Sequence, residues 1–264
     1  MLKISQSLVK AIISDSLEVS ACWKQIYHKY ILKDCEFITS LAMSQGSYFE
    51  SACIGSTAHG DVITELPLAR GKLSVATERI NQQVVIFHDM CKKLNINPAE
   101  NTQHAIQHGD NGFIRRGVLD WYPVTLFGRK VIIDLKMTAN LDSTIHPFGW
   151  GLDDNCELMV DEDTGIQYYY GTPFTIDSIQ ADFYKSLVKK VYDEDVEFVY
   201  FVFESSKLLR NRIYFAKSNL ELTEMRVSAV KSMLTDRIKS KVWEEIPNTL
   251  RCKRCSLECQ HRII

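Results

Sequence analysis

The sequence lacks a long hydrophobic run. None of its apolar stretches approaches the roughly 20 residues that a helix needs to cross a bilayer. The segment MLKISQSLVKAIISDS also lacks the continuous apolar stretch and the small-residue cleavage site of a signal peptide. We therefore expect a protein without a membrane partner that works in the cytoplasm, or in the host cytoplasm if a phage encodes it.

Internal repeats, low-complexity tracts and a clear interdomain linker are also missing, which argues against a solenoid or loosely joined domains. A chain of 264 residues with 45% hydrophobic content can bury one substantial core. We expect a single domain, 1–264, with an N-terminal helical segment at 1–45, a core at 46–217 and a basic helix with a cysteine-rich tail at 218–264. An insert at about 142–175 interrupts the core.

The sequence has little net charge, with an overall value of -2. The charges are nevertheless unevenly placed, because residues 205–264 carry an excess of Lys and Arg and the remainder an excess of Asp and Glu. No Lys or Arg lies between Lys136 and Lys185, where Asp142, Asp153, Asp154, Glu157, Asp161, Glu162 and Asp163 accumulate. A solvated acidic loop beside basic helices explains this pattern. An enzyme that gathers divalent cations at one place and holds phosphates at another explains it equally.

Hydrophobic periodicity predicts an α/β architecture. Helical patterns cover 5–32 with a break near 14–20, a stretch from about 46, and the ranges 72–94, 179–192 and 220–242. Strand patterns occupy 102–138, 196–204 and 210–217, and 159–170 resembles a small inserted hairpin. This order predicts a mixed central β-sheet flanked by helices.

The segment GVLDWYPVTLFGRKVIIDLKMT is predicted to form two strands joined by a tight turn at 127–130. Side chains two apart in a strand share a face, so Asp134 and Lys136 point the same way. The hairpin returns the strand of Asp134 beside that of Asp120. Two carboxylates in an apolar sheet repel each other unless a cation neutralises them, and Mg²⁺ or Mn²⁺ prefer oxygen ligands.

Four short motifs occur in a fixed order. Gly46-Ser-Tyr-Phe-Glu50 lies in a predicted helix, Gly117-Val-Leu-Asp120 and Asp134-Leu-Lys136 lie in predicted strands, and Gln180 and Tyr184 share one helix face. In this order the motifs resemble those of the PD-(D/E)xK nucleases. The similar branch contains RecB-type nuclease domains, lambda-type exonucleases and the iron-sulfur nucleases of CRISPR adaptation. Leu119 stands where the family name has proline, and Glu50 stands where RecB-type members have His and lambda-type members have Glu.

The resemblance implies a restriction-endonuclease-like core and a divalent-metal-dependent hydrolysis of phosphodiester bonds. It implies that Glu50, Asp120, Asp134 and the Leu135 carbonyl bind Mg²⁺ or Mn²⁺, and that Lys136 orients the attacking water or stabilises developing charge. The plainer interpretations are an edge-strand ion pair for Asp134 and Lys136, a surface helix position for Glu50 and a core position for Tyr184.

The resemblance further implies a DNA exonuclease that acts on ends or single strands in recombination, repair or phage DNA metabolism, with a recombination or replication protein as a second partner. A structure-specific or nicking endonuclease and an inactive nucleic-acid-binding scaffold are the alternatives. From the basic C-terminal charge we expect nucleic acid to contact Lys231, Arg237 and Lys239.

Three of the eight cysteines are crowded near the C-terminus as Cys252, Cys255 and Cys259, which suggests a soft-metal site. In the iron-sulfur nucleases that the chain resembles, one N-terminal and three C-terminal cysteines hold a [4Fe-4S] cluster. The resemblance therefore implies Cys22 as the fourth ligand. A Zn²⁺ site completed by His261 or Cys35 is the alternative, and unligated thiols are a third. Cys53, Cys91 and Cys156 are assigned to packing.

Overall fold

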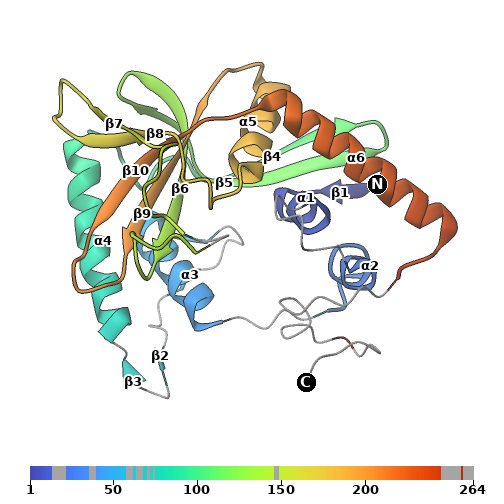
Figure 1. The fold of residues 1–264 in the computed structure, drawn as a ribbon, viewed down its shortest axis with the longest axis horizontal. Helices are drawn as coiled ribbons and strands as arrows, with labels where there is room; N and C mark the ends of the chain where they lie inside the picture. Colours follow the sequence, from blue (N-terminus) through green and yellow to red (C-terminus); the bar gives the residue numbers. More distant parts are fainter. Residues whose placement is uncertain are drawn as a thin grey trace.

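A computed structural model of the chain describes residues 1–13, 22–35, 40–57, 62–63, 68–69, 72–73, 75–145, 149–244 and 257 (Figure 1). Its centre is an eight-stranded mixed sheet in the order β1-β5-β6-β9-β10-β8-β7, with β4 paired to β5. The strands are β1 Leu2–Ile4, β4 Thr102–Asp110, β5 Phe113–Leu126, β6 Arg129–Thr138, β7 Glu157–Val160, β8 Gln167–Tyr170, β9 Glu197–Glu204 and β10 Asn211–Ala216. The pairs β1–β5, β6–β9 and β8–β10 are parallel, and the others are antiparallel.

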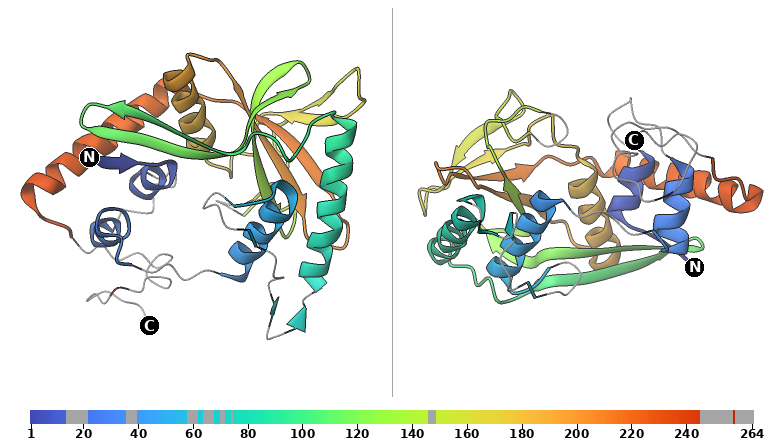
Figure 2. Two further views of the ribbon diagram at one scale, coloured as in Figure 1. Left: turned by 180° about the vertical axis from the view of Figure 1, so that it is seen from behind. Right: turned by 90° about the horizontal axis from the view of Figure 1, so that it is seen from below.

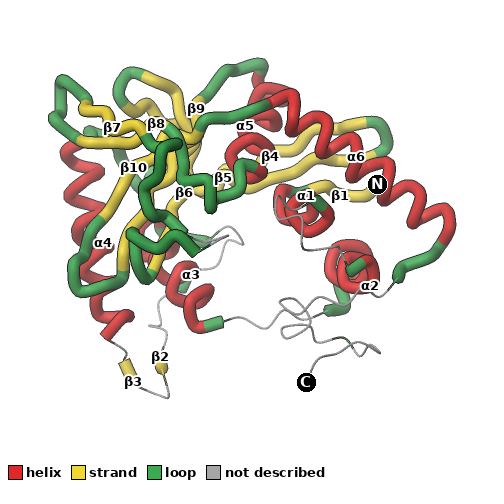
Figure 3. Tube along the Cα trace, in the orientation of Figure 1, coloured by secondary structure: helices red, strands yellow, loops and turns green. Residues whose placement is uncertain are grey.

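Helices cover both faces of this sheet (Figures 2 and 3). They are α1 Gln6–Ile12, α2 Trp23–Ile26 with its π-helical continuation η1 Tyr27–Leu32, α3 Leu41–Ile54, α4 Val75–Lys93, α5 Ile179–Tyr192 and α6 Leu220–Ser240. A separate pair of short strands, β2 Leu68–Ala69 and β3 Lys72–Leu73, precedes α4. Among the residues that the structure describes, no helix is long and apolar enough to cross a membrane.

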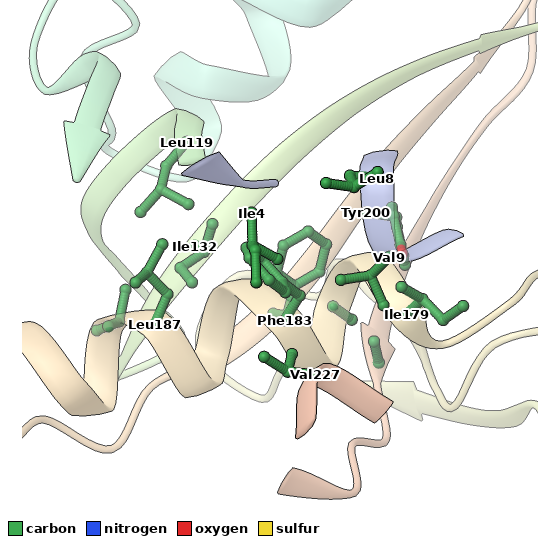
Figure 4. Packing of buried hydrophobic residues seen from close by; sticks show 14 of the residues in the cluster. Ile4, Leu8, Val9, Leu119, Ile132, Ile179, Phe183, Leu187, Tyr200 and Val227 are labelled. Atoms are coloured by element: carbon green, nitrogen blue, oxygen red, sulfur yellow. The ribbon is translucent and has the colours of Figure 1, made fainter. Parts of the chain in front are cut away.

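Strand β9, EFVYFVFE, lies between two hydrophobic layers. Phe198, Tyr200 and Val202 belong to the cluster that includes α1, α5 and α6, and this layer is seen from close by in Figure 4. Phe201 and Phe203 belong to the opposite cluster, which includes α3 and α4. A strand buried on both faces is continuously apolar, which is the pattern of its sequence. The predicted mixed α/β sheet flanked by helices is therefore confirmed.

Several elements differ from the predictions. Helix α3 begins at Leu41, not near Gly46, because the Ser40 side chain accepts a hydrogen bond from the Met43 amide and caps the helix earlier. Helix α4 begins at Val75, not at 72, because Lys72–Leu73 pair with β2. The N-terminal residues Leu2–Ile4 form an unpredicted strand that pairs with β5.

The two predicted hairpins are present. Strands β5 and β6 meet at Phe127 and Gly128, which both have a left-handed backbone, as two-residue hairpin turns require. Strands β7 and β8 form the inserted hairpin and extend the main sheet through β10, so that β7 is an edge strand with all four residues exposed. The predicted break at 14–20 lies outside the described residues.

Candidate active site

Asp120 lies where β5 separates from β6. The backbone pairs between these strands run from Leu126–Arg129 to Trp121–Ile133 and stop there. Beyond that point the Asp120 Oδ2 atom accepts a hydrogen bond from the Leu135 amide at 3.1 Å, so a carboxylate takes the place of a main-chain partner. The divergence of the two strands thus opens a place for a polar side chain inside the sheet.

Asp134 is the most enclosed of the candidate residues, with only 2% of its surface exposed. Its Oδ1 atom accepts a hydrogen bond from the Gln180 Nε2 atom at 2.6 Å, and its Oδ2 atom forms an ion pair with the Lys136 ammonium. The Lys136 side chain keeps 32% exposure, so the ammonium lies between the buried carboxylate and solvent. The expected face-sharing of Asp134 and Lys136 is confirmed by this contact.

Glu50 reaches the site from α3. Its Oε1 atom accepts a hydrogen bond from the Gln103 Nε2 atom at 2.8 Å. Burial raises the pKa of the Asp120 carboxyl well above its ordinary value, and the negative charges of Asp134 and Glu50 raise it further. Asp134 and Glu50 are therefore close enough to oppose the ionisation of Asp120.

The same negative charges stabilise the charged form of Lys136. Burial lowers its pKa, but the carboxylates of Asp134, Asp120 and Glu50 outweigh burial and raise it above the ordinary lysine value. The pKa of Asp134 is raised by burial, and Lys136 offsets only part of that rise. The ammonium is held in its charged form, and the cluster of three carboxylates with one ammonium carries an excess of negative charge when fully ionised.

Gln180 and Tyr184 lie one turn apart on α5, as the Q-x-x-x-Y spacing predicted. Burial raises the pKa of the Tyr184 hydroxyl, and the charges of Asp120 and Asp134 add to the rise, so this hydroxyl stays protonated beside the carboxylates. The Tyr184 ring also packs over Gly117, where an added Cβ would lie 2.5 Å from Cε1. Gly117 is the residue that lets α5 approach the sheet this closely.

The structure thus brings Glu50, Asp120, Asp134, Lys136, Gln180 and Tyr184 into one electrostatic cluster, while their roles in catalysis stay predictions. Gln103 is the residue that the sequence reasoning missed. It belongs to no motif, and its hydrogen bond to Glu50 and its place in the strand opposite Asp120 connect it with the site.

The expected cation is Mg²⁺ or Mn²⁺, and Glu50, Asp120 and Asp134 are its expected side-chain ligands. In the part of the chain that the structure describes, no three His, Cys, Asp or Glu side chains form a ready metal-ligand group. Each carboxylate instead has partners within the protein. Asp134 pairs with Lys136 and accepts from Gln180, Glu50 accepts from Gln103, and Asp120 accepts from the Leu135 amide. Three mutually repelling carboxylates supply only oxygen donors and excess negative charge, which are the properties that fit a hard divalent cation.

The three α6 residues expected to contact nucleic acid have different surroundings. Lys231 forms an ion pair with Asp110 and is 16% exposed at its side chain. Arg237 pairs with Glu244 at 2.8 Å and lies 4.9 Å from the centre of the Trp23 ring. Lys239 is exposed. The proposed contact with nucleic acid is untested for all three, and Lys239 is the most accessible of them.

A hollow of about 430 Å³ lies between α2 and α6, where it is lined by Trp23, Met233, Asp236, Arg237 and Ser240. Glu50, Asp120 and Asp134 do not contribute to its walls. The hollow is thus separate from the candidate site.

The described cysteines differ in how far they are buried. Cys53 and Cys91 are buried between α3 and α4, and burial raises the pKa of the Cys91 thiol to about 12, so both are inert packing residues. Cys156 is half-buried against Asp153. Cys22 has a free, half-buried thiol at the start of α2. Its proposed co-ligands Cys252, Cys255 and Cys259, and the alternative ligand His261, lie outside the described residues.

No protein-family model and no curated protein matches the chain. One similar solved structure is the "Putative exonuclease" from Eubacterium rectale, with a TM-score of 0.59 and 17% identity over 90% of this chain and 82% of that one. A second is the protein SSO0001, with a TM-score of 0.41 and 10% identity over 99% of this chain and 87% of the other. This structural likeness is too low to support an inference. At this identity the first likeness shows the fold alone.

Proposed function

We propose that this protein is a divalent-metal-dependent nuclease that hydrolyses phosphodiester bonds in DNA. The observation that carries the proposal is that Asp134, Asp120 and Glu50 all act electrostatically on the Lys136 ammonium, which forms an ion pair with Asp134. The ion pair between Asp134 and Lys136 alone is compatible with a purely structural role. The charges of Asp134 and Glu50 also raise the pKa of Asp120, and a structural core gains nothing from placing repelling carboxylates together.

In this proposal Glu50, Asp120, Asp134 and the Leu135 carbonyl hold Mg²⁺ or Mn²⁺. The cation supplies charge stabilisation at the phosphate and lowers the pKa of a bound water. Lys136, held in its charged form, donates hydrogen bonds to the attacking water or to the phosphate oxygens. Gln180 fixes the orientation of the Asp134 carboxylate through its 2.6 Å hydrogen bond. The protonated Tyr184 hydroxyl is a further donor for a phosphate oxygen.

The finer proposal is an exonuclease that serves recombination, repair or phage DNA metabolism and works with a recombination or replication protein. The motif resemblance supports this proposal, and the name of the Eubacterium rectale protein of similar fold agrees with its exonuclease part alone. The exposed Lys239 belongs to the DNA-binding surface in this proposal. Cys22 and the C-terminal cysteines hold a [4Fe-4S] cluster, with Zn²⁺ as the alternative ion.

The deciding experiment incubates the purified protein with end-labelled linear DNA and with closed circular DNA, single- and double-stranded, in the presence of Mg²⁺ or Mn²⁺. Shortening of linear DNA with intact circles supports an exonuclease, and cutting of circles supports the endonuclease alternative. DNA binding without cleavage under any metal condition would support the inactive scaffold instead.

Substitutions at the candidate residues test whether any observed cleavage comes from this site. Asp134→Asn and Lys136→Met are expected to lose it. Asp163→Asn is the matched control, because Asp163 is exposed in the turn between β7 and β8. Cleavage at the normal rate by Asp134→Asn would overturn the assignment of the site, and equal loss in Asp163→Asn would point to a contaminating nuclease or to a general effect.

A further inference from the structure

Gln103 occupies the position in β4 that lies across from Asp120 in β5. The neighbouring backbone pairs Thr102–Trp121 and His104–Leu119 fix this register. Gln103 itself has a left-handed backbone, with φ at 50°, although it is the second residue of β4. A glutamine rarely adopts this conformation, and such strain persists only where the surrounding structure enforces it.

The Gln103 side chain connects β4 to the C-terminal end of α3. Its Nε2 atom donates to the Glu50 Oε1 atom at 2.8 Å and to the Ser56 carbonyl oxygen at 3.3 Å. Both partners are acceptors only, because Glu50 is a carboxylate and Ser56 contributes its main-chain oxygen. The chemistry therefore fixes which end of the amide points toward Glu50, and the reversed amide would place its oxygen against two oxygens.

This orientation leaves the Gln103 Oε1 atom buried and without a hydrogen-bond donor among the described residues. A buried acceptor without a donor is unfavourable and is rare in folded proteins. A water molecule carried by a hydrated divalent cation at the carboxylates would supply the missing donor. Mg²⁺ in particular keeps several of its waters when protein carboxylates bind it.

We propose that Gln103 is a positioning residue for the divalent cation. Its amide nitrogen orients the Glu50 carboxylate, and its amide oxygen accepts a hydrogen bond from a water of the bound ion. The proposal rests on the metal-dependent function given above. Partners that orient a metal ligand typically change metal affinity by roughly 10–100-fold when they are removed.

Two substitutions separate the side chain from the strained backbone. Gln103→Gly removes the amide and also relieves the left-handed strain, because glycine adopts positive φ without a steric penalty. Gln103→Met keeps the length of the side chain and the strain but removes both hydrogen-bonding atoms. Gln107→Met is the matched control, because Gln107 is exposed on the same strand.

The primary readout is the affinity for Mn²⁺, measured by calorimetry or by electron paramagnetic resonance with no DNA present. We expect both Gln103 variants to bind Mn²⁺ roughly 10-fold or more weakly than the wild type. Without metal, the melting temperature of Gln103→Gly should lie above that of Gln103→Met, because glycine relieves the backbone strain. In cleavage assays the Mn²⁺ concentration for half-maximal rate should rise, and saturating Mn²⁺ should restore most of the maximal rate.

Asp120→Asn distinguishes a failure of this inference from a failure of the proposed function. If the wild type binds Mn²⁺, Asp120→Asn abolishes that binding and the Gln103 variants bind normally, then the positioning role is wrong and the metal-dependent function stands. If the wild type binds no Mn²⁺ or Mg²⁺, the proposed function itself is wrong and Gln103 has no cation to position. An equal loss of affinity in Gln107→Met would also overturn the assignment to Gln103.

Discussion

The Gln180 amide nitrogen lies 2.6 Å from the Asp134 Oδ1 atom and joins α5 to β6 at the centre of the carboxylate cluster. Gln180→Leu is expected to remove this donor without adding charge, leaving the Asp134 carboxylate held by its ion pair with Lys136. Cleavage should fall by roughly 10- to 100-fold, as for other partners that orient a ligand. Gln180→Glu should reduce cleavage further, because it places a fourth carboxylate beside Asp134. Equal, wild-type rates for both variants would exclude an orienting role.

Removing one charge from the cluster should stabilise the metal-free protein. Asp120→Asn keeps an oxygen that can accept from the Leu135 amide but removes the charge that Asp134 and Glu50 oppose. We expect a rise in melting temperature at neutral pH of a few degrees, since about 1 kcal/mol corresponds to roughly 2–4 °C for a chain of similar length. Cleavage should be lost in the same variant. A lower melting temperature than that of the wild type would contradict the repulsion that the pKa of Asp120 indicates.

The Tyr184 ring leaves no room for a side chain at position 117. Gly117→Ala places a Cβ 2.5 Å from the Tyr184 Cε1 atom, so the ring or helix α5 must shift. We expect a destabilisation of about 1–3 kcal/mol, which is typical of overpacked cores, together with reduced cleavage. Gly109→Ala is the control, because an added Cβ there meets nothing within 4 Å. Denaturant unfolding of Gly117→Ala in the wild-type and Tyr184→Ala backgrounds tests whether the clash is the cause, because the cost of Gly117→Ala should be smaller where the ring is absent.

The Arg115–Glu224 pair predicts how stability depends on pH. Arg115 donates to both Glu224 oxygens, at 2.7 and 2.6 Å, and joins β5 to α6. Burial raises the pKa of Glu224, but the bonds from Arg115 and Ser186 outweigh it and lower the pKa to about 2. A lowered carboxyl pKa contributes stability above its unfolded value of about 4.3, and this contribution disappears as the pH falls through about 2.

Glu224→Gln should therefore be less stable than the wild type at pH 6, and the difference should shrink steadily between pH 4.5 and pH 2. Thermal unfolding of both proteins across that range is the measurement. The effect should be modest, because 39% of the Glu224 side chain is exposed and solvent screens the pair. A difference that stays constant down to pH 2 would show that packing, not the ion pair, is responsible.

The sequence was sufficient to predict the parts of this site that depend on regular periodicity. Asp134 and Lys136 share a face because a strand repeats every two residues, and Gln180 and Tyr184 share one because a helix repeats every 3.6. Gln103 could not be found in this way. Its left-handed backbone breaks the alternation of β4, and its partner Glu50 is 53 residues away in the sequence. The strand Leu2–Ile4 was missed for a similar reason, because only its long-range pairing with β5 defines it.

The basic residues of α6 provide a test of the DNA-binding surface. Lys239→Glu changes an exposed residue and should weaken DNA binding without lowering the melting temperature. Lys231→Glu also breaks the ion pair with Asp110, so it should lower stability as well as binding. The logarithm of the binding constant should fall linearly with the logarithm of the salt concentration, and the slope should be reduced by about one in Lys239→Glu. Unchanged binding and slope in Lys239→Glu would place the DNA elsewhere.

The proposed iron-sulfur cluster requires Cys22 to lie near the three C-terminal cysteines. Helix α2, which follows Cys22, contacts the residues that lead into the cysteine-rich tail. The Lys24 amide donates to the Glu244 carbonyl at 3.1 Å, and the rings of Tyr27 and Trp243 stack with centres 4.6 Å apart. The chain that continues toward Cys252 therefore leaves from beside the helix that Cys22 begins.

Four thiolates from the two ends of the chain would close a loop of more than two hundred residues, and such a crosslink stabilises the folded state by roughly several kcal/mol in the chain-entropy account. Anaerobically purified protein should then be brown, with broad absorbance near 400 nm and about four irons per chain. Cys255→Ala should bleach this colour and lower the melting temperature, whereas Cys91→Ala, at a buried site of ordinary packing, should keep the colour. Colourless, iron-free protein of normal stability from iron-replete anaerobic growth would refute the cluster. Stoichiometric zinc in that sample would favour the Zn²⁺ site, and Cys35→Ala and His261→Ala would then identify its remaining ligand.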